Sequence, residues 1–220
     1  MKENTSKTFP EILDPDQQKA LLKLQPILKD FVLGGGTALA LQIKHRRSFD
    51  FDFFTKNTLG KNLLENINRL GFSFVETVFD TENELSLILE QKVKVTFLSY
   101  PFPCIFEQVF SDQIIKLFSL PGLAAQKAYT VGRRGVWRDY YDIFSLLSKD
   151  YFSLEEIIKL ASNEYGDIFN SKLFLSQLVY FDDIHDFEIE PIDNGLAVMS
   201  QSEVKSFLEK EVKSYMENMK

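Results

Sequence analysis

Two aspartates separated by a single residue are the side chains in this sequence best suited to chemistry. Asp50 and Asp52 lie in the stretch Phe49–Phe54, where aromatic and acidic residues alternate as on a half-buried strand. Their carboxylates should leave one face, with Cα atoms roughly 6.5–7 Å apart, while Phe49, Phe51 and Phe53 enter the core on the other. Mg²⁺ usually takes one or two carboxylates with phosphate oxygens and water, so the pair predicts a site for Mg²⁺ or Mn²⁺. A pair of solvated acids is the alternative for this pattern alone.

A run of glycines precedes the acidic pair. Gly34-Gly35-Gly36-Thr37 follows the short apolar run Phe31–Leu33 and precedes a helical pattern that Thr37 can cap. Backbone amides of such a turn, with the helix N-terminus behind them, can approach an anion closely. A tight turn without a ligand is the alternative. The candidates for binding a nucleotide's phosphates are the turn and the polar residues that follow the helix: Gly35, Gly36, Thr37, Arg46, Arg47 and Ser48.

A second basic stretch lies further along the chain. The segment between Asp112 and Asp139 contains no acidic residue, so it can face phosphate. Its basic residues are Lys116, Lys127, Arg133, Arg134 and Arg138. Lys127 and Arg134 line one face only if a helix continues through Gly132. Asp139 and Asp142 share a helix face, although Arg138 and Asp142 are also spaced to form a surface ion pair.

The elements expected to position these residues form an α+β fold in two parts, residues 1–110 and 111–220. The first part should be a small mixed sheet with helices, and the second should be mostly helical. The expected helices are 15–29, 37–43 or 37–44, 61–70, 123–130, 136–147 and 204–219, with capping boxes at Ser153/Glu156 and Ser200/Glu203. The expected strands are 31–33, 49–54, 72–80, 85–90 and 93–98, with a further short one at 113–117.

Composition excludes several classes of protein. The net charge of −7 argues against a general nucleic-acid coat protein, and residues 150–220 hold 15 acidic side chains against 6 basic ones. With one cysteine, Cys104, and two histidines, the chain has no ligand set for structural zinc. No apolar run approaches the roughly 20 residues that cross a bilayer, and the N-terminus lacks a secretory signal. We therefore expect a cytoplasmic protein.

Four short motifs in order resemble the AbiEii/AbiGii nucleotidyltransferase toxins, a bacterial branch of the DNA polymerase β-like superfamily. The first two are GGTALAL and HRRSFDFDFF, and the later two are Lys127-Ala-Tyr-Thr-Val-Gly-Arg133-Arg134 and Arg138-Asp139-Tyr-Tyr-Asp142-Ile. The resemblance covers roughly Phe31 to Leu147. It implies a nucleotidyltransferase core followed by a mostly helical part.

The resemblance also implies an activity. Such an enzyme transfers a nucleotide from a nucleoside triphosphate (NTP) to an acceptor hydroxyl, in some members at an RNA acceptor end such as that of tRNA, and acts as a toxin paired with an antitoxin. Gly36 and Thr37 would hold the triphosphate, and Arg133 and Arg134 would add to nucleotide binding. The catalytic residues it implies are Asp50 and Asp52 as metal ligands, Lys127 on phosphate, and Asp139, which we favour over Asp142.

One position departs from the superfamily pattern. Many members carry a third carboxylate on a later strand, and the best-placed strand here has Thr96 instead. Asp139 would then complete the site from the helical part, making the active site a two-part cleft. The alternatives are an inactive nucleotide-binding protein whose acidic helical part engages a basic partner, or an enzyme whose acceptor is a small molecule or a protein side chain.

Overall fold

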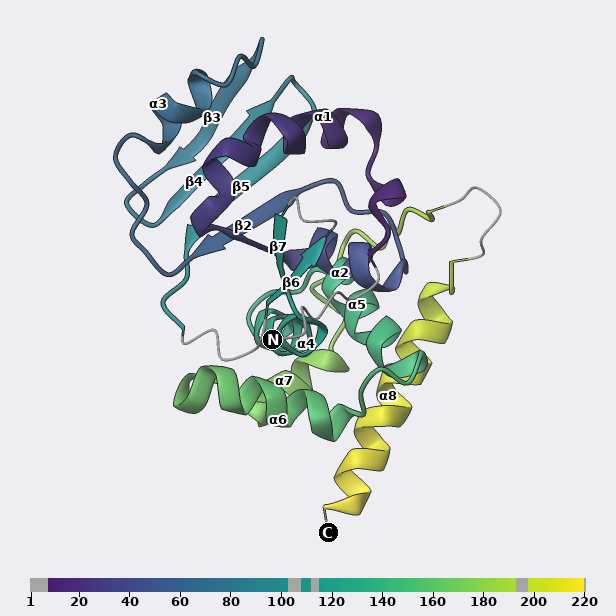
Figure 1. The fold of residues 1–220 in the computed structure, drawn as a ribbon. Helices are drawn as coiled ribbons and strands as arrows, with labels where there is room; N and C mark the ends of the chain where they lie inside the picture. Colours follow the sequence, from purple (N-terminus) through teal and green to yellow (C-terminus); the bar gives the residue numbers. More distant parts are fainter. Residues whose placement is uncertain (1–7, 103–107, 112–114, 193–197, 220) are drawn as a thin grey trace. The chain divides into compact units, whose positions relative to one another are not determined.

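A seven-stranded mixed sheet organises the chain up to Ser119 (Figure 1). The computed structural model describes residues 8–102, 108–111, 115–192 and 198–219. The chain divides into two compact units, called here the sheet unit, which ends at Ser119, and the helical unit, which begins at Leu120. The strands are β1 Val32–Gly34, β2 Phe51–Thr55, β3 Val75–Asp80, β4 Glu84–Leu89, β5 Val93–Ser99, β6 Gln108–Ser111 and β7 Ile115–Phe118.

Strand β2, which carries Asp52, lies inside the sheet. The strand order is β3-β4-β5-β2-β1-β7-β6. β2 pairs in parallel with β5 and antiparallel with β1. Phe51 and Phe53 are fully buried and stack on each other, and Phe53 stacks on Phe97 with ring centroids 5.4 Å apart. The expected burial of Phe49 is wrong: the strand begins two residues later, and Phe49 is 36% exposed.

The helices of the sheet unit begin and end where local chemistry dictates. Helix α1, Pro15–Leu24, starts at a capping box formed by Asp14 and Gln17. The continuous helix expected to Lys29 is wrong: Pro26 lacks an N–H, and residues Gln25–Asp30 form a 3₁₀ helix. α2 spans Gly35–Ile43 and ends at Lys44 in the left-handed region, and α3 is Leu63–Asn68. α1 packs against β5, and α2 against β1 and β2.

The last strands of the sheet unit alter two expectations. Strand β6 was not expected, and the short strand expected at 113–117 is β7, Ile115–Phe118; residues 113 and 114 lie outside the described residues. β7 pairs in parallel with β1 and antiparallel with β6. The division expected near residue 110 therefore falls within the sheet, and the helical unit starts at Leu120.

The helical unit packs five helices around aromatic side chains in its described residues. They are α4 Leu120–Val131, α5 Trp137–Ser148, α6 Leu154–Tyr165, α7 Ser171–Leu178 and α8 Gln201–Asn218. Both expected capping boxes, at Ser153 and Ser200, are present. α4 packs against α5 and α6, and α8 packs against α5, α6 and α7. Among the described residues, no helix combines the length and apolar character needed to cross a membrane.

Candidate active site

The glycines at the start of α2 make room for the second aspartate. Gly34 pairs with Asp52 across β1 and β2. Gly35 has φ +65°, and a Cβ atom there would collide with Oδ2 of Asp52. A Cβ at Gly36 would lie 2.6 Å from Nη2 of Arg46 and 3.0 Å from Oγ of Ser48. Gly35 and Gly36 therefore bring a carboxylate and a guanidinium against the first turn of a helix.

Thr37 has a different role from the one expected. α2 begins two residues before it, with Gly34 at the N-cap, so Thr37 does not cap the helix. Its buried hydroxyl instead bonds to the main-chain oxygen of Asp50 and to Oγ of Ser48, the latter at 2.9 Å. Asp50 precedes β2 rather than lying on it. The hydrogen bond from Thr37 therefore fixes the main chain of Asp50, which lies just before the start of β2.

The basic loop between α2 and β2 packs tightly on the same region. Arg46 is buried and donates from Nη1 to the main-chain oxygen of Arg47 at 2.8 Å. Arg47 and Ser48 are half-buried. The loop thus places two cations and a hydroxyl within a few residues of Asp50.

Gln17 is a residue of this site that the sequence did not reveal. Its side chain donates from Nε2 to the main-chain oxygen of Ser48 at 2.9 Å. Asp14 and Gln17 have the spacing of a capping box, which predicts the hydrogen bonds between these two residues. That spacing does not predict the bond from Gln17 to Ser48.

Thr96 occupies the position beside Asp52 on the neighbouring strand. The parallel register of β2 and β5 pairs Asp52 with Thr96, as expected for the place of a third carboxylate. Thr96 is buried and accepts a hydrogen bond from Ser86 at 3.2 Å. Within the described residues, no group of three or more His, Cys, Asp or Glu is arranged to hold a metal ion.

The donor set that remains suits a hard divalent cation. Asp50 and Asp52 offer carboxylate oxygens, and Mg²⁺ commonly uses only one or two of these with substrate phosphates. A Cβ atom at Gly35 would collide with Oδ2 of Asp52, so the glycine allows this carboxylate to lie against the first turn of α2. The residues present therefore fit such an ion in company with a phosphorylated substrate.

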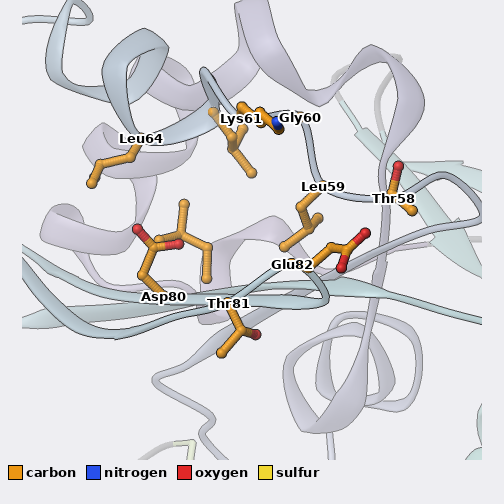
Figure 2. Close-up of a pocket in the computed structure, with 10 residues that line it drawn as sticks. Thr58, Leu59, Gly60, Lys61, Leu64, Asp80, Thr81 and Glu82 are labelled. Carbon is orange, nitrogen blue, oxygen red and sulfur yellow. The ribbon is translucent and has the colours of Figure 1, made fainter.

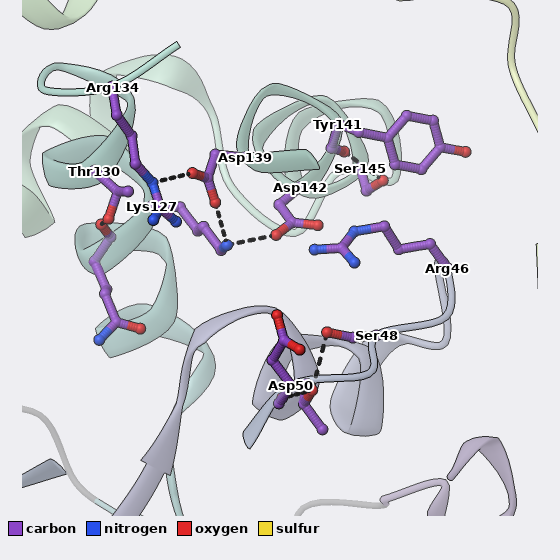
Figure 3. Close-up of polar contacts among 12 residues, drawn as sticks. Arg46, Ser48, Asp50, Lys127, Thr130, Arg134, Asp139, Tyr141, Asp142 and Ser145 are labelled. Atoms are coloured by element: carbon purple, nitrogen blue, oxygen red, sulfur yellow. Dashed lines mark hydrogen bonds and ion pairs between the residues drawn. The ribbon is translucent and has the colours of Figure 1, made fainter. Parts of the chain in front are cut away.

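The helical unit holds a charge cluster, defined as three buried residues, Lys127, Asp139 and Asp142, and the exposed Arg134 (Figure 3). Nζ of Lys127 lies 2.6 Å from Oδ1 of Asp139 and 2.7 Å from Oδ2 of Asp142. Nε of Arg134 lies 2.9 Å from Oδ2 of Asp139. The side chains of Lys127, Asp139 and Asp142 are 5%, 2% and 0% exposed, while Arg134 is 58% exposed. Two cations and two carboxylates leave the cluster without net charge.

The pKa of Asp139 reflects this arrangement. Burial raises the pKa of the carboxyl, but the positive charges of Lys127 and Arg134 outweigh burial and the neighbouring Asp142. The net result is a pKa below the ordinary value, so Asp139 is ionised at neutral pH.

The cluster corrects two expectations. The surface ion pair between Arg138 and Asp142 is wrong, because Asp142 is fully buried and pairs with Lys127. A helix through Gly132 that aligns Lys127 with Arg134 is also wrong, because α4 ends at Val131. Arg134 reaches Asp139 from the loop between α4 and α5 instead.

Arg133, the neighbouring arginine of that loop, lies over an aromatic pair. Its guanidinium carbon is 4.0 Å from the ring centroid of Tyr129, and Tyr129 stacks on Tyr165 at 4.2 Å. Arg133 also donates to the main-chain oxygen of Ile168 at 3.0 Å. These contacts hold its exposed side chain in one place.

A cavity of about 670 Å³ lies elsewhere in the sheet unit (Figure 2). It is bounded by the segment that leads into α3 and by the turn between β3 and β4, where Asp80 and Glu82 face Lys61 and Leu64. None of the candidate site residues lines it.

A family model described as nucleotidyl transferase AbiEii toxin, type IV toxin–antitoxin system, matches residues 19–218. The uncharacterized protein aq_aa25 of Aquifex aeolicus is 31% identical over 212 residues, which cover 94% of this chain and 98% of that protein.

Two solved structures share the fold. One is MenT4, a nucleotidyltransferase toxin of Mycobacterium tuberculosis, with a TM-score of 0.60, 17% identity, and coverage of 89% of this chain and 80% of that one. The other is a Helicobacter pylori protein provisionally described as a nucleotidyltransferase, with a TM-score of 0.57, 17% identity, and coverage of 94% and 99%.

Proposed function

Because the chain belongs to the AbiEii family of nucleotidyltransferase toxins, we propose that it transfers a nucleotide from an NTP to an acceptor hydroxyl with the help of Mg²⁺ or Mn²⁺. The acceptor we propose is RNA, in the first instance the 3′ end of tRNA. The observation that carries this proposal is the contact between Asp52 and the glycine start of α2. It brings a carboxylate of the kind that Mg²⁺ prefers next to backbone amides suited to phosphate.

Each residue of the sheet unit has a distinct part in this proposal. Asp50 and Asp52 hold the divalent cation, which when bound neutralises phosphate charge. Gly35, Gly36 and Thr37 provide the first turn of α2, whose N–H groups and dipole attract the triphosphate. Arg46 and Arg47 add positive charge beside the triphosphate, and Ser48 adds a hydroxyl. Phosphoryl transfer depends mainly on such positioning and charge neutralisation.

The charge cluster is proposed to serve nucleotide binding from the helical unit. An ammonium group has three N–H donors. The ammonium group of Lys127 contacts the carboxylates of Asp139 and Asp142 within the fold. We propose that Lys127 contacts phosphate, that Asp139 orients Lys127, and that Arg133 and Arg134 add positive charge. The buried position of Lys127 would fix its ammonium group in advance of substrate.

Labelled triphosphates test the proposal directly. The purified protein is incubated with each α-³²P-NTP and total RNA, with Mg²⁺, Mn²⁺ or EDTA, and the products are separated on a gel. We expect label on RNA of tRNA size that requires the metal and is lost in Asp52→Asn. Label on protein or on a small molecule would show that the acceptor is not RNA. Absence of label under every condition would refute nucleotide transfer.

A second candidate is a protein that binds nucleotide without turnover. The observation that favours it is Thr96, which leaves the sheet without a third carboxylate beside Asp52. Calorimetry with non-hydrolysable NTP analogues separates the two: tight binding together with no labelled product would favour the binding protein.

We also propose a cognate antitoxin as the cellular partner and the cytoplasm as the site of action, where NTPs and tRNA occur. The motivation is the toxin–antitoxin description of the family. Expression of the chain alone should arrest growth, and Asp50→Asn/Asp52→Asn should relieve the arrest. Toxicity that persists in the double variant would contradict an enzymatic cause.

A further inference from the structure

The side-chain amide of Gln17 joins the first helix to the loop that carries the site. Its Oε1 accepts a hydrogen bond from the main-chain N–H of Asp14 at 3.1 Å, completing the capping box of α1. Its Nε2 donates to the main-chain oxygen of Ser48 at 2.9 Å, across 31 residues of sequence. The residue is only 2% exposed. Both ends of one buried amide are therefore used, one locally and one at long range.

Ser48 is the point at which two elements hold the loop. Gln17 from α1 binds its main-chain oxygen, and Thr37 from α2 binds its hydroxyl. Thr37 also holds the main-chain oxygen of Asp50, two residues further on. Ser48 is therefore linked to Asp50 both along the main chain and through the hydroxyls of Ser48 and Thr37, so a shift at Ser48 is passed on to Asp50.

The family resemblance does not reach this contact. The family model begins to match at residue 19, after Asp14 and Gln17. The pairing also joins neutral groups, so it positions the loop without adding charge that would compete for a cation.

We propose that Gln17 is a positioning residue that holds Asp50 in place for the divalent cation. This rests on the proposed function only in assigning the cation to Asp50 and Asp52. Supporting residues behind metal ligands typically change metal affinity by about 10–100-fold. Because Gln17 acts through Ser48, we expect the low end of that range.

The substitution Gln17→Glu separates the two halves of the contact. A glutamate at this position keeps the acceptor for Asp14 N–H, as in an ordinary capping box, but it cannot donate to the oxygen of Ser48. Gln17→Met removes both bonds at similar volume and adds no charge. Asp14→Ala weakens the cap and leaves the bond from Gln17 to Ser48 in place. Gln18→Glu is the matched surface control, since exposed Gln18 bonds only within its own segment, at Leu13.

The experiment measures Mn²⁺ binding to the full chain by electron paramagnetic resonance, with no nucleotide or acceptor, and thermal unfolding of each variant. Gln17→Glu and Gln17→Met should weaken Mn²⁺ binding by about tenfold. Asp14→Ala and Gln18→Glu should bind Mn²⁺ as the native chain does, even though Asp14→Ala unfolds at a lower temperature. In activity assays, the Mg²⁺ concentration for half-maximal rate should rise in the two Gln17 variants.

The outcomes distinguish this inference from the proposed function. If the native chain binds Mn²⁺, Asp50→Asn abolishes binding and both Gln17 variants bind normally, the positioning role is refuted and the cation site stands. If Asp14→Ala weakens Mn²⁺ binding as much as Gln17→Met does, Gln17 acts only through the stability of α1, which also overturns the inference. If neither Asp50→Asn nor Asp52→Asn weakens Mn²⁺ binding, the proposed cation site itself is refuted.

Discussion

The two units hold their carboxylates in opposite ways. In the helical unit, Asp139 and Asp142 are buried and already neutralised by Lys127 and Arg134. In the sheet unit, the main-chain oxygen of Asp50 accepts a neutral hydrogen bond from Thr37, and no ion pair to the Asp50 carboxylate is found among the described residues. Removing one partner of a buried ion pair leaves an uncompensated charge inside the fold, whereas a carboxylate positioned through its main chain can offer its charge to a ligand. The difference predicts which substitutions affect activity and which affect folding.

The largest effect should come from removing charge at Asp52. Asp52→Asn keeps the shape beside Gly35 but weakens the cation site, and a cation contributes several kcal/mol to such a reaction. We expect nucleotide transfer to fall by on the order of 10⁴-fold, a proportionally larger change than that in the midpoint of urea unfolding. An unfolding midpoint that falls along with activity would erase the contrast between the units.

Removal of Lys127 should lower the stability of the fold as well as transfer, in contrast to Asp52→Asn. Lys127→Met leaves two buried carboxylates without their shared cation, and breaking a buried pair costs about 3–5 kcal/mol. Urea unfolding should show this loss. The control Lys127→Met/Asp139→Asn/Asp142→Leu removes the stranded charges and should regain much of the stability. A Lys127→Met chain as stable as the native one would contradict the structural role of the cluster.

Gly35 offers a smaller and more local change. Alanine at φ +65° costs about 1–3 kcal/mol where the backbone cannot relax, and its Cβ would displace the carboxylate of Asp52. Gly35→Ala should therefore lose both stability and metal-dependent transfer. Gly60→Ala is the matched control, because a Cβ there meets no neighbouring atom and should change neither property.

The smallest effect concerns acid stability of the helical unit. The folded pKa of Asp139 is lowered, so its contribution to stability is fully present above the ordinary pKa near 3.9 and is lost as pH falls through the folded value. Between these values the unfolded chain binds more protons, and stability rises with pH. Asp139→Asn should flatten the stability curve below about pH 4. The exposed carboxyls with lowered pKa are retained in this variant and give a common background: Asp16, Glu90, Glu156 and Glu203.

The sequence predicted what depends on short spacing. The strand with Asp52 and both serine capping boxes follow from residues one to four positions apart. The helix after the glycines was also expected, but it starts at Gly35 and not at Thr37. The superfamily pattern suggested Thr96 at the place of a third carboxylate, and the register of β2 and β5 pairs Thr96 with Asp52.

Contacts between distant segments were not predictable in the same way. The bond from Gln17 to Ser48 spans two elements whose packing no local pattern encodes. For Asp142, the four-residue spacing to Arg138 favoured a local ion pair, but burial of that helix face selected Lys127 on the preceding helix. An assignment of charge partners needs the tertiary fold, since burial raises the cost of an unpaired carboxylate.

The parallel pairing of β2 with β5 also determines when the acidic site can exist. Parallel neighbours need a crossover, and here the chain passes through α3, β3 and β4 before β5 can lie beside Asp52. Pairings between segments far apart in sequence form late in folding. During synthesis on the ribosome, a chain that ends before β5 has the aspartates and the glycines but not the strand that supports them. We therefore expect the site to form only after β5 has paired with β2.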